Sequence, residues 1–140
     1  MTGVWAVVAV AVLVAAVGVV KKVRDGRVRA GREVALPEPV RALLDPAAPV
    51  TLVQLSTTFC TPCRQTKALL TDLAARTDGL RHVELDVTDR PEVATGLGVL
   101  RTPTTLALTP SGVELLRVGG VPKTGELIDA LRSHLPRPNG

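Results

Sequence analysis

Two cysteines, Cys60 and Cys63, are the side chains whose type and spacing best fit covalent chemistry in this sequence. No other cysteine is present, and the Cys-x-x-Cys spacing lets the two sulfurs close one disulfide within a helical turn. A disulfide scaffold would need more cysteines spread along the chain, and a structural zinc site normally needs four ligands. The pair therefore favours a redox role, in which a thiolate attacks a disulfide and can later leave again.

The residues around the pair predict a strand followed by a helix. Residues 50–55 form an apolar, strand-like run, and Pro62 suits the first turn of a helix, where its missing N–H is not needed. Cys60 would then lie at the helix start, where free backbone N–H groups and the helix dipole favour a thiolate. We therefore expect Cys60 to be the attacking sulfur and Cys63, one turn further, the buried resolving sulfur. Thr61 and Pro62 would set the turn between them.

The rest of the pattern predicts one α/β domain over residues 33–135. Its elements follow in the order β-α-β-α-β-α-β-β-α, beginning with a strand near residues 33–35. The first half suits parallel strands joined by helices, and the last two strands suit an antiparallel pair, which gives a sandwich with a mixed central sheet. Residues 136–140 are predicted to form a flexible tail.

An uninterrupted apolar segment precedes the domain. Residues 3–20 carry no charged side chain, and as a helix they would span roughly 27 Å, close to the hydrocarbon thickness of a bilayer. A cleaved signal peptide would have a basic region before the apolar run, but Met1 and Thr2 provide none. A buried core helix would need more surrounding protein than this chain supplies. We therefore predict one N-terminal transmembrane helix at residues 3–20.

Basic residues are concentrated directly behind that helix. Residues 21–32 contain six Lys and Arg and one acid, whereas residues 33–140 contain 11 basic and 12 acidic side chains. The net charge of +4 thus describes a basic juxtamembrane linker rather than a basic domain, and nucleic acid is not an expected partner. The positive-inside rule predicts a single-pass cell-membrane protein with a cytoplasmic domain. An extracytoplasmic domain is the alternative.

From about residue 33 to residue 135 the chain resembles the thioredoxin family. The motifs that carry the resemblance are residues 50–55, FCTPCR at 59–64, LDV at 85–87 and GVLRTPT at 98–104, followed by Ser111-Gly112 and Gly119. The resemblance implies a three-layer α/β/α sandwich that exchanges disulfides with protein substrates and needs no cofactor or metal. It also implies a cis peptide bond between Thr102 and Pro103, with the Thr102 backbone pairing with a substrate chain. Phe59, Thr61 and Pro62 would help to position that substrate.

Three positions depart from the pattern usual in that family. Phe59 stands where Trp is common, Thr61 where Gly is common, and Gln54 where a buried Asp is thought to relay a proton to the second cysteine. Gln cannot titrate, and the register places Glu84 opposite it. Our hypothesis is that Glu84 has taken over the relay, with its pKa raised by burial, and the alternative is an exposed strand glutamate.

The predicted function is a membrane-tethered thiol–disulfide oxidoreductase that acts on protein disulfides and is recharged by a reductase or another thiol donor. Two alternatives are a thioredoxin-fold binding module with low redox turnover and a metal-binding Cys-x-x-Cys protein. His82 and His134 are interpreted as surface residues.

Overall fold

A mixed five-stranded sheet forms the centre of the domain. The computed structural model describes residues 1–33 and 35–137 of the chain. The strands are β1 (Val28–Ala30), β2 (Val50–Ser56), β3 (Leu80–Asp86), β4 (Thr104–Leu108) and β5 (Glu114–Gly119). Their order across the sheet is β1-β5-β4-β2-β3. The pair β2–β3 is parallel and the pair β4–β5 is antiparallel, as predicted. The pairs β1–β5 and β2–β4 are also antiparallel.

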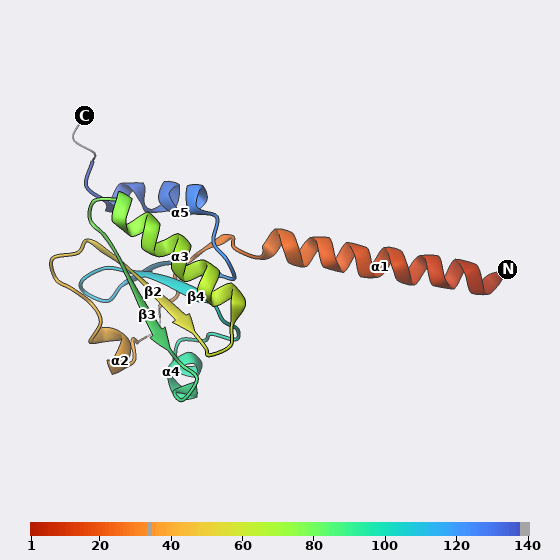
Figure 1. Cartoon of the computed structure of the whole chain (residues 1–140), viewed down its shortest axis with the longest axis horizontal. Coiled ribbons are helices and arrows are strands. Elements are labelled where there is room, and N and C mark those ends of the chain that lie inside the picture. Colours follow the sequence, from red (N-terminus) through yellow and green to blue (C-terminus); the bar gives the residue numbers. More distant parts are fainter. Residues whose placement is uncertain (34, 138–140) are drawn as a thin grey trace.

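Helices cover both faces of this sheet (Figure 1). They are α2 (Glu38–Arg41), α3 (Thr61–Arg76), α4 (Pro91–Gly96) and α5 (Thr124–Leu131), which a 3₁₀ turn extends to His134. Helix α1 (Thr2–Arg24) projects away from the sheet (Figure 1). Helices α3 and α5 lie on one face, and α2 and α4 lie on the other (Figure 1). The predicted three-layer α/β/α sandwich is therefore confirmed.

The alternation of side chains along β2 explains how one strand serves both layers. Successive residues of a strand point to opposite faces. Val50 and Leu52 join the apolar cluster beneath α3 and α5, whereas Val53 and Leu55 join the cluster against α2 and α4. Gln54 and Ser56 continue the face of Val50 and Leu52, so these polar side chains lie beneath the first turn of α3.

The sheet begins earlier in the chain than predicted. Strand β1 lies inside the segment 21–32 that was predicted to be a linker, and Val28 pairs with Val118 of β5. A strand of three residues has no alternation long enough to recognise, and it exists because the edge of β5 supplies its hydrogen-bonding partners. The backbone N–H of Val28 also donates to the carboxylate of Glu126 on α5, over 3.2 Å. The predicted linker is thus partly an edge strand.

Two further predictions concern the ends of the domain. Of the strand predicted near residues 33–35, Glu33 and Ala35 lie outside the strands, and Val34 lies outside the described residues. In the predicted tail, Pro136 and Arg137 have no regular structure, and residues 138–140 lie outside the described residues.

Helix α1 is long and apolar enough to cross a membrane. It has 23 residues, its most apolar window has a mean hydropathy of 2.7, and none of its residues is buried in the described structure. It extends beyond the predicted residues 3–20 and includes the basic residues Lys21, Lys22 and Arg24 in its last turn.

The junction between α1 and the domain is held by specific contacts. The N–H of Gly26 donates to the Gly119 carbonyl over 2.8 Å, and Arg101 pairs with Asp25 over 2.5 Å. Gly26 has a φ of 76°, and a Cβ there would collide with the carbonyl oxygen of Val121. The end of α1 is therefore tied to one edge of the sheet, close to the loop before β4.

Candidate active site

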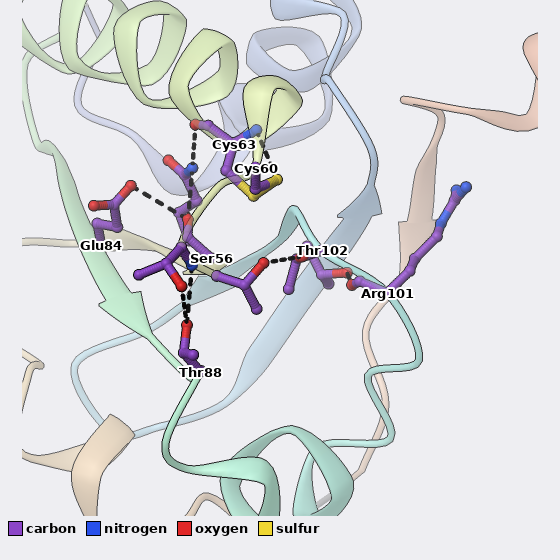
Figure 2. Close-up of a disulfide and its surroundings, with 11 residues drawn as sticks. Ser56, Cys60, Cys63, Glu84, Thr88, Arg101 and Thr102 are labelled. Atoms are coloured by element: carbon purple, nitrogen blue, oxygen red, sulfur yellow. Dashed lines mark hydrogen bonds between the residues drawn. A yellow bond between two sulfur atoms is a disulfide. The ribbon is translucent and has the colours of Figure 1, made fainter.

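The two cysteines form a disulfide at the start of α3 (Figure 2). Cys60 is the N-cap residue of the helix, and the backbone N–H of Cys63 lies 3.2 Å from the Cys60 sulfur. Pro62 lies in the first turn, where its missing N–H leaves no helical hydrogen bond unmade. Cys63 is only 2% exposed, whereas Cys60 is partly exposed. This arrangement supports Cys60 as the attacking sulfur, because a donor at a helix start stabilises a thiolate.

The residues next to Cys60 form an exposed rim. Phe59 is fully exposed, and Thr61 and Pro62 are also exposed. Phe59 has a φ of 59°, in the left-handed region that a bulky residue rarely adopts. Strained backbone of this kind occurs most often where a site requires it. The three residues that were predicted to position substrate therefore lie together beside the reactive sulfur.

The loop before β4 approaches the same site. The Thr102–Pro103 peptide bond is cis, as predicted from the family resemblance, and Pro103 is buried. The hydroxyl groups of Thr57 and Thr102 lie 3.1 Å apart and join this loop to the segment before Cys60 (Figure 2). The hydroxyl of Thr104 donates to the Arg101 carbonyl over 2.7 Å. These contacts place Thr102 at the edge of the cysteine site.

Gln54 is the centre of a hydrogen-bonded network beneath the disulfide. Its side chain is fully buried, and its amide nitrogen donates to the Cys63 carbonyl over 2.8 Å and to the Ser56 hydroxyl over 3.0 Å. Its amide oxygen lies 2.9 Å from Nε2 of His82. Both N–H groups and the oxygen of the amide are thus used, which fixes the amide orientation.

Glu84 reaches this network from β3. It is the register partner of Gln54, as predicted, and it accepts a hydrogen bond from the Ser56 hydroxyl over 3.2 Å. Its side chain is 30% exposed and pairs with Lys67 of α3 over 3.5 Å. Glu84 is therefore connected to Cys63 through Ser56 and Gln54, and this path ends at the Cys63 carbonyl rather than at its sulfur.

The sequence model of the family described as Thioredoxin matches residues 40–133, which include both cysteines and Pro103. The chain belongs to the thioredoxin family. It is 31% identical over 94 residues to Thioredoxin 1 of Nostoc sp., a match that covers 66% of this chain and 86% of that protein. Helix α1 and strand β1 precede the residues 40–133 that the family model matches.

Solved structures agree with this assignment. A thioredoxin from Nicotiana alata is 30% identical with a TM-score of 0.54, and the match covers 62% of this chain and 74% of that one. A thioredoxin pre-protein from Schistosoma mansoni shares the fold at 21% identity with a TM-score of 0.59, covering 73% of this chain and 95% of that one.

Family membership and a cysteine pair at disulfide distance make this thioredoxin-family protein a thiol–disulfide oxidoreductase. Its substrates are accordingly protein thiols and disulfides. Among the described residues, no three His, Cys, Asp or Glu side chains are grouped as metal ligands would be.

His82 is the site residue that the sequence reasoning missed. It was interpreted as a surface residue, but its ring is half-buried between Gln54 and Thr71 of α3. Burial lowers the pKa of His82 below its usual value, and the Lys67 charge adds to this effect while the Glu84 charge opposes it. The available signal was strand alternation, since residues 82 and 84 share one face of β3 and His82 pairs in register with Leu52.

We expect His82 to make the free energy of unfolding depend on pH. Its pKa is lower in the folded chain than the 6.5 of an unperturbed imidazole, so the unfolded chain binds the proton more tightly. The stability contribution is therefore complete above pH 6.5 and is lost as the pH falls through the folded pKa. The slope for one proton is at most about 1.4 kcal/mol per pH unit.

Urea unfolding of the full chain between pH 7.5 and pH 5 checks this expectation. The variant His82→Gln should lose less stability over that interval than the unsubstituted protein does. His134→Gln removes an exposed histidine and is the control for losing an imidazole as such. Parallel curves for the unsubstituted protein and His82→Gln would contradict the assignment.

Proposed function

We propose that this protein is tethered to the cell membrane by α1 and reduces disulfides of proteins at the cytoplasmic face. The observation that carries the redox part is the position of Cys60, partly exposed at the start of α3 beside the Thr102 loop, with Cys63 buried behind it. The apolar α1 and the basic Lys21, Lys22 and Arg24 in its last turn support the tether and its orientation.

The exchange proceeds in two displacements. The Cys60 thiolate attacks one sulfur of the substrate disulfide, and the second substrate sulfur leaves as a thiolate. Cys63, once deprotonated, then attacks the Cys60 sulfur, which closes the intramolecular disulfide and releases the first substrate sulfur. Two electrons pass from the cysteine pair to the substrate, and a thiol donor or reductase must return them.

The exposed rim supports a binding mode for the substrate chain. Phe59 offers an apolar ring beside the reactive sulfur, and Thr61 and Pro62 extend the same surface. The substrate chain would pair with the Thr102 backbone, next to the buried Pro103, in the manner of an added strand.

We propose that Glu84 accepts the proton of the Cys63 thiol. Gln54 cannot accept a proton, and Glu84 is the carboxylate joined through Ser56 to the Gln54 amide, which itself contacts the Cys63 carbonyl. In Glu84→Gln we expect the rate of disulfide reduction at neutral pH to fall roughly tenfold. Glu92→Gln on α4 removes an exposed carboxylate that takes no part in the hydrogen-bonded network of Gln54, and it serves as the control. An unchanged rate and pH profile in Glu84→Gln would end the relay hypothesis.

Insulin reduction by the full chain in lipid nanodiscs tests the activity. The unsubstituted protein should reduce insulin with dithiothreitol as the thiol donor, and Cys60→Ser should not exceed the uncatalysed rate. Equal rates for the two proteins would overturn the proposed reductase function.

Thiol labelling of intact cells tests the tether and its orientation. After reduction, a membrane-impermeant maleimide should fail to label Cys60 in intact cells but label it after the cells are opened. Labelling from outside would place the domain on the other face, and a soluble chain lacking residues 1–24 would show that α1 had been cleaved.

A further inference from the structure

An open cavity of about 680 Å³ lies where α1 meets the domain. Its walls come from the last turns of α1, from β1 and the residue Arg32 behind it, from the loop 98–101 and from β5. The contacts of Asp25 and Gly26 described above hold these segments together. The lining contains neither cysteine and none of Phe59, Thr102 and Pro103, so the cavity requires its own explanation.

The cavity carries an excess of positive charge. Its cationic lining residues are Lys21, Arg24, Arg29, Arg32, Arg101 and Arg117. Among the residues that the structure describes, two of these are neutralised, because Arg101 pairs with Asp25 over 2.5 Å and Arg117 pairs with Glu114 over 2.6 Å. The other four are exposed and form no ion pair there. The cavity therefore suits an anion.

Two glycines make room for the arginine side chains on the floor of the cavity. A Cβ at Gly98 would lie 2.8 Å from a guanidinium nitrogen of Arg32, and one at Gly119 would lie 3.1 Å from a guanidinium nitrogen of Arg101. Arg29 also stands opposite Arg117 in the β1–β5 pair. The Arg117 charge is already paired with Glu114, so Arg29 is the cation at this position that forms no ion pair among the described residues.

One wall of the cavity is apolar. Ala16, Val17 and Val20 of α1 line it directly before Lys21, where the predicted membrane segment ends. A free phosphate would use only the cationic floor. A phospholipid matches both surfaces, because its acyl chain would lie along α1 in the hydrocarbon layer while its phosphate meets the arginines in the headgroup layer.

We infer that this cavity binds an anionic phospholipid, with the phosphate between Arg29 and Arg32 and an acyl chain against Val17 and Val20. The inference rests on the proposed membrane tether. It goes beyond attraction of a basic linker to a charged surface, because strand β1, β5 and the loop 98–101 build the binding site together with α1.

Such a lipid would fix the position of the cysteine site relative to the bilayer. Leu100 and Arg101 line the cavity and directly precede Thr102 and Pro103. Leu100 is 99% exposed and would lie at the interface when the lipid is bound. The substrate-positioning loop would then lie beside the membrane surface, which restricts the substrates to disulfides close to the bilayer.

Electron spin resonance on the full chain in phosphatidylcholine membranes tests this inference. The probes are spin-labelled phosphatidylglycerol and spin-labelled phosphatidylcholine, and the measured quantity is the motionally restricted fraction of each. The unsubstituted protein should restrict the anionic probe preferentially. Arg29→Gln/Arg32→Gln should reduce that preference, by up to about five-fold for each cation removed.

A matched pair separates a built site from general attraction. Lys22→Gln/Arg27→Gln removes the same charge from the same segment, but neither residue lines the cavity, so the preference should largely persist. Equal losses in both double variants, or displacement of the anionic probe by excess inorganic phosphate, would overturn the lipid site. Thermal unfolding of each variant confirms that it is folded.

The spin-labelled phosphatidylcholine distinguishes failure of the lipid site from failure of the membrane tether. Restricted phosphatidylcholine without a preference for the anionic probe would refute the lipid site but leave the tether intact. If neither probe is restricted, α1 does not insert, and both the tether and the lipid site fail.

Discussion

Replacing Cys63 with serine is expected to turn this protein into a trap for its substrates. Cys60 keeps its place at the start of α3 and still attacks the substrate disulfide, because its partly exposed side chain does not depend on the Cys63 thiol for access. The second displacement then lacks its nucleophile, so the mixed disulfide accumulates. Turnover in the insulin assay should fall to the uncatalysed rate.

Non-reducing electrophoresis and mass spectrometry detect the trapped species. Incubation of the full-length Cys63→Ser protein with a disulfide-containing peptide should give a covalent adduct on Cys60 that dithiothreitol releases. Cys60→Ser should form no such adduct, because Cys63 is only 2% exposed. An adduct on Cys63 in Cys60→Ser would reverse the assigned roles of the two sulfurs.

Replacing Glu114 with alanine is expected to cost about 3–5 kcal/mol of stability, because it leaves a buried charge without its partner. The side chains of Glu114 and Arg117 are 2% and 8% exposed, and two hydrogen bonds of 2.6 Å and 3.0 Å join them. Arg117 also donates to the Leu97 carbonyl over 2.9 Å, which links β5 to the end of α4. The thermal midpoint should fall by more than about 10 °C.

The exposed pair of Asp72 and Arg76 on α3 provides the comparison. Both side chains are more than half exposed, although their 2.8 Å separation is close to the 2.6 Å of the buried pair. Asp72→Asn should therefore change stability by less than about 0.5 kcal/mol. Similar destabilisation in Glu114→Ala and Asp72→Asn would show that burial does not determine how much each ion pair contributes to the free energy of unfolding.

The features that the sequence determined are those with a local physical cause. Pro62 and the apolar stripe behind it define the start of α3, and this start places Cys60 at the helix N-cap. The apolar run at residues 50–55 predicted β2, and its parallel register with β3 brought Gln54 and Glu84 opposite each other as expected. The length and composition of residues 3–20 were enough to predict a helix that is exposed along its whole length.

Three features depended on partners that are remote in sequence. Strand β1 exists through its pairing with β5, and no pattern in its three residues distinguished it from a linker. His82 is half-buried because α3 and Gln54 cover it, although an alternating strand alone allowed an exposed ring. The third feature is the ion pair of Glu114 and Arg117, which would point to opposite faces of a regular strand.

A β-bulge brings that last pair together. The register between β4 and β5 shifts at Ala107 and Leu108, so that Leu116 and Glu114 are their successive partners and Leu115 is the extra residue. The extra residue reverses the alternation and turns Glu114 to the side of Arg117. The sequence alone therefore determined the chemistry of Cys60 and Cys63, because a helix start and two thiols are local features. Only the tertiary structure decided which polar groups support that chemistry and which cations surround the cavity, because burial and pairing depend on segments far apart in the chain.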